Sequence, residues 1–293
     1  MATVPRPEYT WTCRGRSLRV GGIRTRVMGI LNCTPDSFSD GGRFADARAA
    51  VEAGLRMAQE GADILDIGGE SSRPGAEPVP ADGEIRRVAP VIEGLRASGC
   101  TLPISIDTCK AEVARAALEA GADIVNDIRA LSDPGMPAVV RATGAGVVLM
   151  HMRGEPRTMQ DDPRYGDVLA DVGAFLAARA AQARAEGIAA EAIVLDPGIG
   201  FGKTAQHNWM LLEGMARMPA PARPWLIGAS RKRFIGDALG RPPAGRRAGS
   251  LAVAVWAVLR GASIIRTHDV KETCDAVAMA DRMREIEATH GVD

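Results

Sequence analysis

The chain has 293 residues, of which 46% are hydrophobic and 25% are charged. Its 36 basic and 36 acidic side chains cancel, so the formal net charge at pH 7 is zero. A broad nucleic-acid-binding surface would need a basic excess, and a membrane span would need about 18 consecutive apolar residues. The sequence offers neither, so we expect no nucleic-acid partner and no membrane partner.

Five cysteines are scattered along the chain without a C-x-x-C pair. An odd and scattered set is typical of reduced thiols, and it disfavours both a disulfide framework and a zinc site. Residues 1–17 lack the apolar stretch of a secretory signal. These features predict a cytoplasmic protein. The cysteines are Cys13, Cys33, Cys100, Cys109 and Cys274.

The first predicted element is a short β-hairpin over residues 9–22, which alternate in character around Arg14-Gly15. After it, apolar runs of four to seven residues alternate with Ala-rich stretches of helical periodicity. Such short apolar runs are typical of parallel strands that are buried on both faces. The predicted helices cover 46–60, 84–97, 110–120, 135–143, 167–186, 205–217, 246–260 and 270–289.

Each apolar run leads into polar residues of kinds that bind or transform ligands. Repeated Gly-Ala-Asp or Gly-Ala-Ser turns at 61–63, 121–123 and 261–263 end helices before strands, where glycine suits a left-handed conformation. In chain order the strand-end residues are Asn32, Glu70 to Arg73, Asp107, Asn126, His151, Asp196, Ser230 to Lys232, and Arg266 to His268.

Eight successive strand–helix units predict an α/β fold of the (β/α)8 TIM-barrel type, with the short hairpin in front of it. We expect one domain over 1–293, with the barrel proper at about 27–285 and the hairpin at 9–22. An open doubly wound sheet is the alternative. In either fold the carboxyl ends of the strands share one rim, so the strand-end residues would meet in one pocket.

Three connections exceed the usual βα loop of about 2–6 residues. They cover 32–45, 69–83 and 151–166, and the first two are rich in Gly, Pro and Ser. Long loops over a barrel mouth are candidate lids that exclude water.

A glycine-rich turn follows Asp196, but Pro197 breaks a Walker A pattern and no dinucleotide-binding pattern is met. A carboxylate at the end of a buried strand is costly unless donors approach it. Asp107, Asn126 and Asp196 together suit a flat, nitrogen-rich heterocycle, although each alone could be a structural cap. Met150 and Phe201 could stack on such a ligand or serve ordinary packing.

Basic residues cluster after the last two strands. Only four of the 36 basic residues are lysines, and we favour function for Lys232 and Lys203 over Lys110 and Lys271. Barrel enzymes frequently bind phosphate with the loops after strands 7 and 8. The candidates there are Ser230, Arg231, Lys232, Arg266 and His268.

With these motifs in their order, the chain resembles the bacterial dihydropteroate synthases over about residues 27–285. One departure is Ser72, where that family usually has threonine. The matching blocks are 28–42 (MGILNCTPDSFSDGG), 68–75 (GGESSRPG), 105–108 (SIDT), 126–127 (ND), 149–152 (LMHM), 196–203 (DPGIGFGK), 230–232 (SRK) and 266–268 (RTH).

The resemblance implies a pterin-binding TIM barrel and a transferase of alkyl or aryl groups in folate biosynthesis. The expected reaction condenses (7,8-dihydropterin-6-yl)methyl diphosphate with 4-aminobenzoate to 7,8-dihydropteroate and diphosphate. It further implies Mg²⁺ as cofactor, sulfonamides as inhibitors and a homodimer.

Residue roles follow from the resemblance position by position. Asp107, Asn126, Asp196 and Lys232 would hold the pterin, and Asn32 would ligate Mg²⁺ beside the diphosphate. Asp107, Asp196 and Lys232 are the expected catalytic residues. The other expected substrate-binding residues are Arg266 and His268 at the diphosphate, Ser72, Arg73, Pro74 and Phe38 near 4-aminobenzoate, and Thr267, Ser230, Met150 and Phe201.

Two other functions stay open. One is a pterin-binding barrel like the methyltetrahydrofolate:corrinoid methyltransferases, which do not need the diphosphate cluster. The other is a pterin-binding paralogue without turnover, for which Ser72 is a weak indication. Asn32 in its NCTPDSF context and the Ser-Arg-Lys run at 230–232 favour the synthase.

Overall fold

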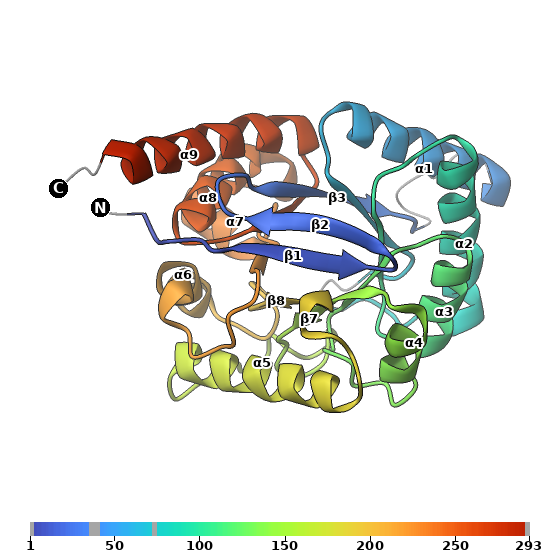
Figure 1. Ribbon diagram of the computed structural model, residues 1–293, viewed down its shortest axis with the longest axis horizontal. Coiled ribbons are helices and arrows are strands. Elements are labelled where there is room, and N and C mark those ends of the chain that lie inside the picture. Colours follow the sequence, from blue (N-terminus) through green and yellow to red (C-terminus); the bar gives the residue numbers. More distant parts are fainter. Residues whose placement is uncertain (1–2, 35–41, 72–74, 291–293) are drawn as a thin grey trace.

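The computed structural model describes residues 3–34, 42–71 and 75–290. Within these ranges, eight strands form one parallel sheet in the order β8-β7-β6-β5-β4-β3-β10-β9, and helices surround it (Figure 1). A parallel bridge between Leu195 of β8 and Trp225, just before β9, joins the two outer strands. The sheet thereby closes into a barrel. The predicted (β/α)8 architecture is confirmed, and the open sheet is excluded.

The barrel strands are short and mostly apolar because both of their faces are covered. One face points into the barrel and the other packs against the helices. The strands are β3 (Arg26–Asn32), β4 (Ile64–Gly68), β5 (Ile104–Asp107), β6 (Ile124–Asp127), β7 (Gly146–Met150), β8 (Ile193–Asp196), β9 (Leu226–Ile227) and β10 (Ile264–Thr267).

Helices follow the strands as the periodicity predicts, with ends that shift by a few residues. Gly61, Gly121 and Gly261 have φ of 101°, 116° and 103°, which confirms the predicted glycine turns between helices and strands. The helices are α1 (Gly42–Gln59), α2 (Ala81–Ala97), α3 (Ala111–Glu119), α4 (Met136–Thr143), α5 (Val168–Ala185), α6 (Ala205–Gly214), α7 (Arg233–Leu239), α8 (Arg247–Leu259) and α9 (Val270–His290).

Helix α7 is the one α-helix in the described residues that the periodicity did not predict. Its seven residues make barely two turns, so an apolar repeat of 3.6 residues cannot stand out in its sequence. The helix starts directly after Lys232, which occupies its N-cap position. It therefore fixes where the turn after β9 ends.

The predicted hairpin is present as β1 (Glu8–Cys13) and β2 (Arg16–Gly21), which pair antiparallel. It crosses the middle of the ring of helices (Figure 1). Trp11 is fully buried in the cluster that fills the barrel interior, together with Ile64 and Ile124. Its Nε1 donates a hydrogen bond of 2.8 Å to the carbonyl oxygen of Ala192, just before β8. The hairpin thus plugs the amino-terminal end of the barrel, opposite the rim where the strands end.

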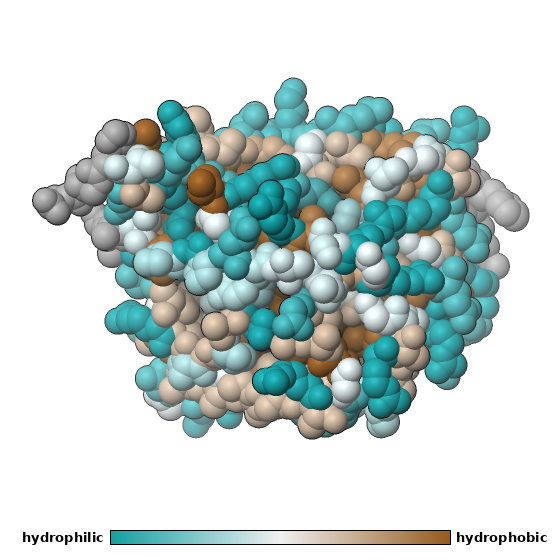
Figure 2. All heavy atoms as spheres, viewed as in Figure 1, coloured by the Kyte–Doolittle hydropathy of each residue, from teal (hydrophilic) through white to brown (hydrophobic). Residues whose placement is uncertain are grey.

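On the face that the hairpin covers, hydrophilic residues intermingle with small separated hydrophobic patches (Figure 2). Among the helices that the structure describes, none combines the length and the apolar character that crossing a membrane requires.

Candidate active site

The carboxyl ends of neighbouring strands bring predicted site residues into one row. In the parallel register, Asn32 of β3 lies beside Gly68 of β4, and Gly68 lies beside Asp107 of β5. Asp107 in turn lies beside Asn126 of β6. Residues separated by up to 94 positions therefore meet at the same rim, as the barrel hypothesis required.

A buried network links this row to β10. Arg266 donates from Nε to Oδ2 of Asp66 and from Nη2 to Oδ2 of Asp107, both over 2.6 Å. Asn126 Nδ2 donates to the same Asp66 oxygen over 3.1 Å. Asp66 is fully buried, and its Oδ1 has no hydrogen-bond partner among the described residues. Asp66 thus orients two of the predicted site residues, Arg266 and Asn126.

No sequence pattern marked Asp66 as part of the site. It stands in the middle of the apolar run ILDIG, whereas the other candidates end their runs. The sequence does offer one signal that could have identified Asp66. It is a carboxylate inside an otherwise apolar strand, and a buried charge requires a partner.

Asp107 interacts with the positive charge of Arg266 and with the negative charge of Asp66. Burial raises the pKa of its carboxyl to about 7, although the nearby Arg266 guanidinium acts in the opposite direction. The alternative role of Asp107 as a helix cap is not observed. Lys110 is the N-cap residue of α3, and the first helical amide, of Ala111, donates to Asp133 over 3.1 Å.

Asp196 ends β8 beside Met150 of β7. Its Oδ1 accepts a hydrogen bond of 2.7 Å from the amide of Gly198, and burial raises the pKa of the carboxyl. Gly198 has φ of 68°, and a Cβ there would lie 1.9 Å from the carbonyl oxygen of His151. Glycine is therefore required in this turn, which supplies one of the donors that the buried carboxylate needs.

Lys232 crosses from the turn after β9 to the turn after β8. Its Nζ donates to the carbonyl oxygen of Ile199 and lies 4.3 Å from the centroid of the Phe201 ring. Burial lowers the pKa of this amine to about 7, partly offset by the Asp196 carboxylate. Asp196, Phe201 and Lys232 thus lie together on one side of the rim.

Lys203 ends the same glycine-rich turn, and its side chain is buried. Its Nζ is 2.9 Å from His151 Nδ1 and donates to the Phe201 carbonyl oxygen over 3.0 Å. Burial lowers the pKa of His151 to about 3 and the pKa of Lys203 well below its ordinary value. The pair ties the glycine-rich turn to the end of β7, so its visible role is to support the turn.

The turn after β10 faces the turn after β9. Ser230 Oγ accepts a hydrogen bond of 3.2 Å from the amide of His268 and lies 3.0 Å from its Nδ1. Thr267 is buried, and its Oγ1 lies 2.9 Å from Thr273 Oγ1 in α9. Ser230, His268 and Arg266 therefore converge at the rim, while the Thr267 hydroxyl is engaged with α9.

A second ionic cluster stands where the sequence suggested only a helix start. Lys110 donates to Oε2 of Glu84 over 2.6 Å and also pairs with Glu70. Glu84 is fully buried in the first turn of α2. Acidic residues are common at that position for helix stability alone, so the sequence could not distinguish this buried pair.

Four expected contacts fall on residues outside the described ranges: Phe38, Ser72, Arg73 and Pro74. Their proximity to 4-aminobenzoate stays a prediction. Within the described part of the chain, no group of three or more His, Cys, Asp or Glu side chains is placed to hold a metal ion.

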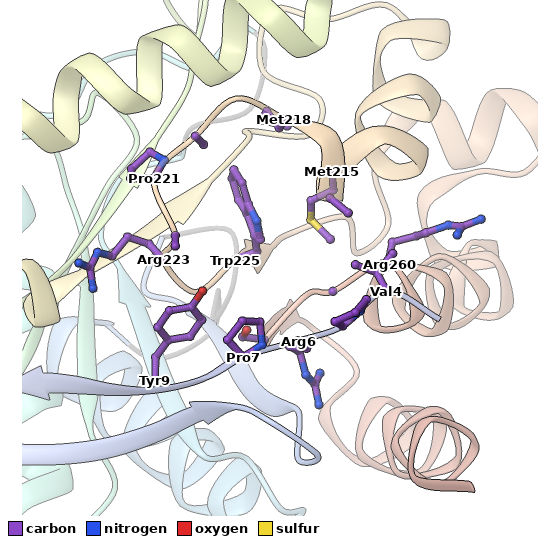
Figure 3. Close-up of a pocket in the computed structure, with 16 residues that line it drawn as sticks. Val4, Arg6, Pro7, Tyr9, Met215, Met218, Pro221, Arg223, Trp225 and Arg260 are labelled. Atoms are coloured by element: carbon purple, nitrogen blue, oxygen red, sulfur yellow. The ribbon is translucent and has the colours of Figure 1, made fainter. Parts of the chain in front are cut away.

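A separate pocket of about 180 Å³ lies between the N-terminal segment and the residues that precede β9 and β10. Trp225 and Met215 contribute apolar walls, and the Tyr9 hydroxyl points inward (Figure 3). The guanidinium groups of Arg6 and Arg260 point away from it (Figure 3). This pocket is at the end of the barrel that the hairpin closes, so it is separate from the rim.

Comparison with known proteins agrees with this geometry. The family model of pterin binding enzymes matches residues 28–268. The dihydropteroate synthase of Escherichia coli K12 is 49% identical over 263 residues, which cover 90% of this chain and 91% of that protein.

Two solved structures have closely similar folds. The Yersinia pestis dihydropteroate synthase in a sulfonamide drug complex has a TM-score of 0.87 and 44% identity, covering 94% of this chain and 99% of that chain. The Xanthomonas albilineans dihydropteroate synthase with 4-aminobenzoic acid has a TM-score of 0.87 and 47% identity, covering 98% and 100%. The chain belongs to the family of pterin-binding enzymes.

Proposed function

We propose that the protein is a dihydropteroate synthase. It would transfer the (7,8-dihydropterin-6-yl)methyl group from its diphosphate to 4-aminobenzoate, releasing 7,8-dihydropteroate and diphosphate. The observation that carries this proposal is the convergence of Asp107, Asn126, Asp196 and Lys232 on one rim, within a chain 49% identical to a synthase of that name.

The first part of the site suits the edge of a pterin ring. Such a ring presents N–H donors and one carbonyl acceptor in a plane. Asp107 and Asp196 offer carboxylate acceptors, and Asn126 offers both a donor and an acceptor. Phe201 supplies an aromatic face next to the Lys232 ammonium. This combination binds a nitrogen-rich heterocycle in one orientation.

The second part of the site suits the diphosphate. Arg266, Lys232 and His268 come from the last two strand ends and their turns, with Ser230 beside the histidine. Arginine and lysine give charge-assisted bonds to phosphate oxygens. These side chains would stabilise the negative charge that develops on the leaving diphosphate.

The proposed chemistry is a dissociative substitution at the methylene carbon. The bond from that carbon to the diphosphate oxygen breaks first, and positive charge builds on the carbon. The negative charges of Asp107 and Asp196 would stabilise it. The arylamine nitrogen then forms the new bond and loses a proton to water. A chemical rate that rose steeply with the basicity of substituted anilines in single turnovers would contradict this order.

Mg²⁺ is the proposed cofactor, held by Asn32 with oxygens of the diphosphate and water. The donor chemistry fits, since Mg²⁺ prefers oxygen ligands and keeps several waters. Asn32 Oδ1 and Asp107 Oδ2 both border the space above Gly68, where a Cβ would lie 3.9 Å and 3.8 Å from them. When bound, the ion would supply positive charge beside the leaving group.

4-Aminobenzoate is the proposed second substrate, and sulfonamides are the proposed inhibitors. The similarity to the Yersinia pestis and Xanthomonas albilineans enzymes supports both. We expect sulfonamide inhibition to be relieved as 4-aminobenzoate is raised. Inhibition that stayed constant over that range would contradict a shared site near Phe38 and Pro74.

A homodimer is the proposed assembly. Three adjacent helices, α6, α7 and α8, expose large apolar side chains on this chain. The Trp209 ring of α6 packs edge-on against Phe234 of α7 at 4.7 Å between centroids, so α6 and α7 share one surface. A clustered apolar surface is typical of a subunit interface. The exposed residues are Trp209, Met210, Leu239 and Trp256.

A cytoplasmic location is proposed with this function. All five cysteines are free thiols, which suits a reducing compartment.

A coupled diphosphate-release assay tests the proposed function. We expect release only when pterin diphosphate, 4-aminobenzoate and Mg²⁺ are all present. A binding-only paralogue would take up pterin without releasing diphosphate. A corrinoid-dependent methyltransferase would turn over methyltetrahydrofolate instead. Either outcome would overturn the assignment.

A further inference from the structure

Arg231 has an unusual backbone conformation at the rim. Its φ is 58°, in the left-handed region, and it stands between Ser230 and Lys232. This region is unfavourable for a residue with a side chain, and glycine is the usual occupant. Such conformations persist only where the surroundings enforce them, and they concentrate at functional sites.

The side chain of Arg231 is engaged on the neighbouring turn. Its Nε donates to Oδ2 of Asp269 over 3.0 Å, and its Nη2 donates to Oδ1 over 2.6 Å. Asp269 is buried and directly follows His268. Two parallel bonds from a guanidinium to a carboxylate fix orientation as well as distance. The sequence pattern grouped Arg231 with the anion-binding cations. In the structure, its guanidinium is already paired with the Asp269 carboxylate.

The backbone of Arg231 is held as well. Its amide donates to Ser250 Oγ in α8 over 2.9 Å, and its carbonyl oxygen accepts from Arg246 Nη1 over 3.1 Å. The contact between Ser230 and His268 also joins the turn after β9 to the turn after β10. The turn after β9 and the turn after β10 are therefore fastened at several points around one strained residue.

We propose that Arg231 is a positioning residue for the diphosphate end of the site. Its pairing with Asp269 holds the left-handed turn and locks it to the β10 turn, which presets the directions of Lys232, Ser230 and His268. This inference rests on the proposed function. It goes beyond that function because Arg231 would act without touching the substrate.

The test compares Arg231→Ala, Asp269→Asn and the double variant in the diphosphate-release assay with Mg²⁺. Each single change is expected to raise KM for the pterin diphosphate about tenfold, as lost support of a binding group typically does. KM for 4-aminobenzoate should stay within about twofold, because the pair supports the diphosphate side. The double variant should show no larger rise in KM for the pterin diphosphate than Asp269→Asn alone, because Asp269→Asn already removes the pair with Arg231.

Two further variants separate the ion pair from general effects. Arg247 also pairs with Asp269, at 3.3 Å, but it belongs to α8 and lies outside the strained turn. Arg247→Ala is the matched control and should leave both KM values unchanged. Arg231→Gly relieves the backbone strain but still lacks the guanidinium. Its KM for the pterin diphosphate should therefore lie between those of wild type and Arg231→Ala.

The possible contradictions are distinct. Wild-type KM in Arg231→Ala or Arg231→Gly would show that the pair positions nothing. Additive losses in the double variant, or equal losses for both substrates, would show a merely structural role. Thermal unfolding of each variant reports folding separately. Failure of the wild-type protein to release diphosphate would contradict the proposed function and is recognised before any variant is compared.

Discussion

Arg266 and Asp66 pair inside the barrel although they are 200 positions apart in the chain. The arginine Nε donates to the aspartate Oδ2 over 2.6 Å, and the same oxygen accepts from Asn126 over 3.1 Å. One buried carboxylate therefore orients a group proposed for the diphosphate and a group proposed for the pterin. The network predicts that a change at a residue hidden from substrate alters substrate binding.

The first prediction concerns Asp66→Asn. Losing the charge leaves the partly buried Arg266 guanidinium paired with Asp107 alone, so we expect a loss of about 3–5 kcal/mol in the free energy of unfolding. We also expect kcat/KM for the pterin diphosphate to fall about tenfold to a hundredfold. Urea unfolding and steady-state kinetics measure the two effects.

Asp63→Asn is the matched control for this prediction. Asp63 precedes the same strand and pairs with Arg24 and Arg26 at its other end. Its loss should lower stability without changing KM. Equal kinetic effects of the two variants would remove the case for an orienting role of Asp66.

The second prediction concerns pH and Lys232. Its pKa is about 7 in the folded protein, below the ordinary lysine value of 10.5. Between these values the unfolded chain binds more protons at this site, so its contribution to stability rises with pH. That contribution is complete above 10.5 and is lost as pH falls towards 7. The slope for one proton is about 1.4 kcal/mol per pH unit.

Urea unfolding of Lys232→Met between pH 7 and 10 checks this expectation. The variant should lack the Lys232 part of the pH dependence. Lys271→Met, at an exposed lysine in α9, should retain it. Identical pH profiles for wild type and Lys232→Met would mean that the Lys232 pKa is not lowered.

The third prediction concerns the hairpin. Trp11 is fully buried at the closed end of the barrel, so Trp11→Ala should cost about 3–5 kcal/mol of stability. Because the rim lies at the other end, kcat/KM of the folded fraction should remain near the wild-type value. Ile23→Ala, at an exposed residue after the hairpin, should change neither quantity. A large loss of kcat/KM at a temperature where Trp11→Ala is folded would contradict the separation of plug and site.

The fourth prediction concerns assembly. Trp209→Glu places a charge on the apolar surface of α6, α7 and α8, where burial in an interface would leave it unpaired. We expect sedimentation velocity to show a dimer for wild type and a monomer for this variant. Met279→Glu changes a similarly exposed residue on α9 and should stay dimeric. A monomeric wild type, or a dimeric Trp209→Glu, would place the interface elsewhere or exclude it.

Much of the rim could be predicted from sequence because the fold converts order along the chain into position. Parallel strands of a barrel end at one rim, so Asp107, Asn126 and Asp196 had to converge once their strands were recognised. The hairpin was equally visible, since its alternation and its Arg14-Gly15 turn are local features. Periodicity of that kind needs no knowledge of tertiary contacts.

Other features depend on contacts between distant elements, which a single sequence does not display. Asp66 looks like a polar interruption of a strand until Arg266 is placed beside it. Lys110 looks like an ordinary helix start until Glu84 is seen buried against it. The left-handed turn at Arg231 is invisible because no glycine stands at that position, and the carboxylate of Asp269 that holds it follows another strand.

Equilibrium binding of a dihydropterin tests the central claim most directly. Calorimetric titration of the wild-type protein with 6-hydroxymethyl-7,8-dihydropterin should show one saturable site per chain. Asn126→Ala should weaken this binding about tenfold or more, because it removes hydrogen bonds to the ring edge, while Asp63→Asn should bind like wild type. Wild-type affinity in Asn126→Ala, or no saturable binding by the wild-type protein, would contradict a pterin pocket at this rim.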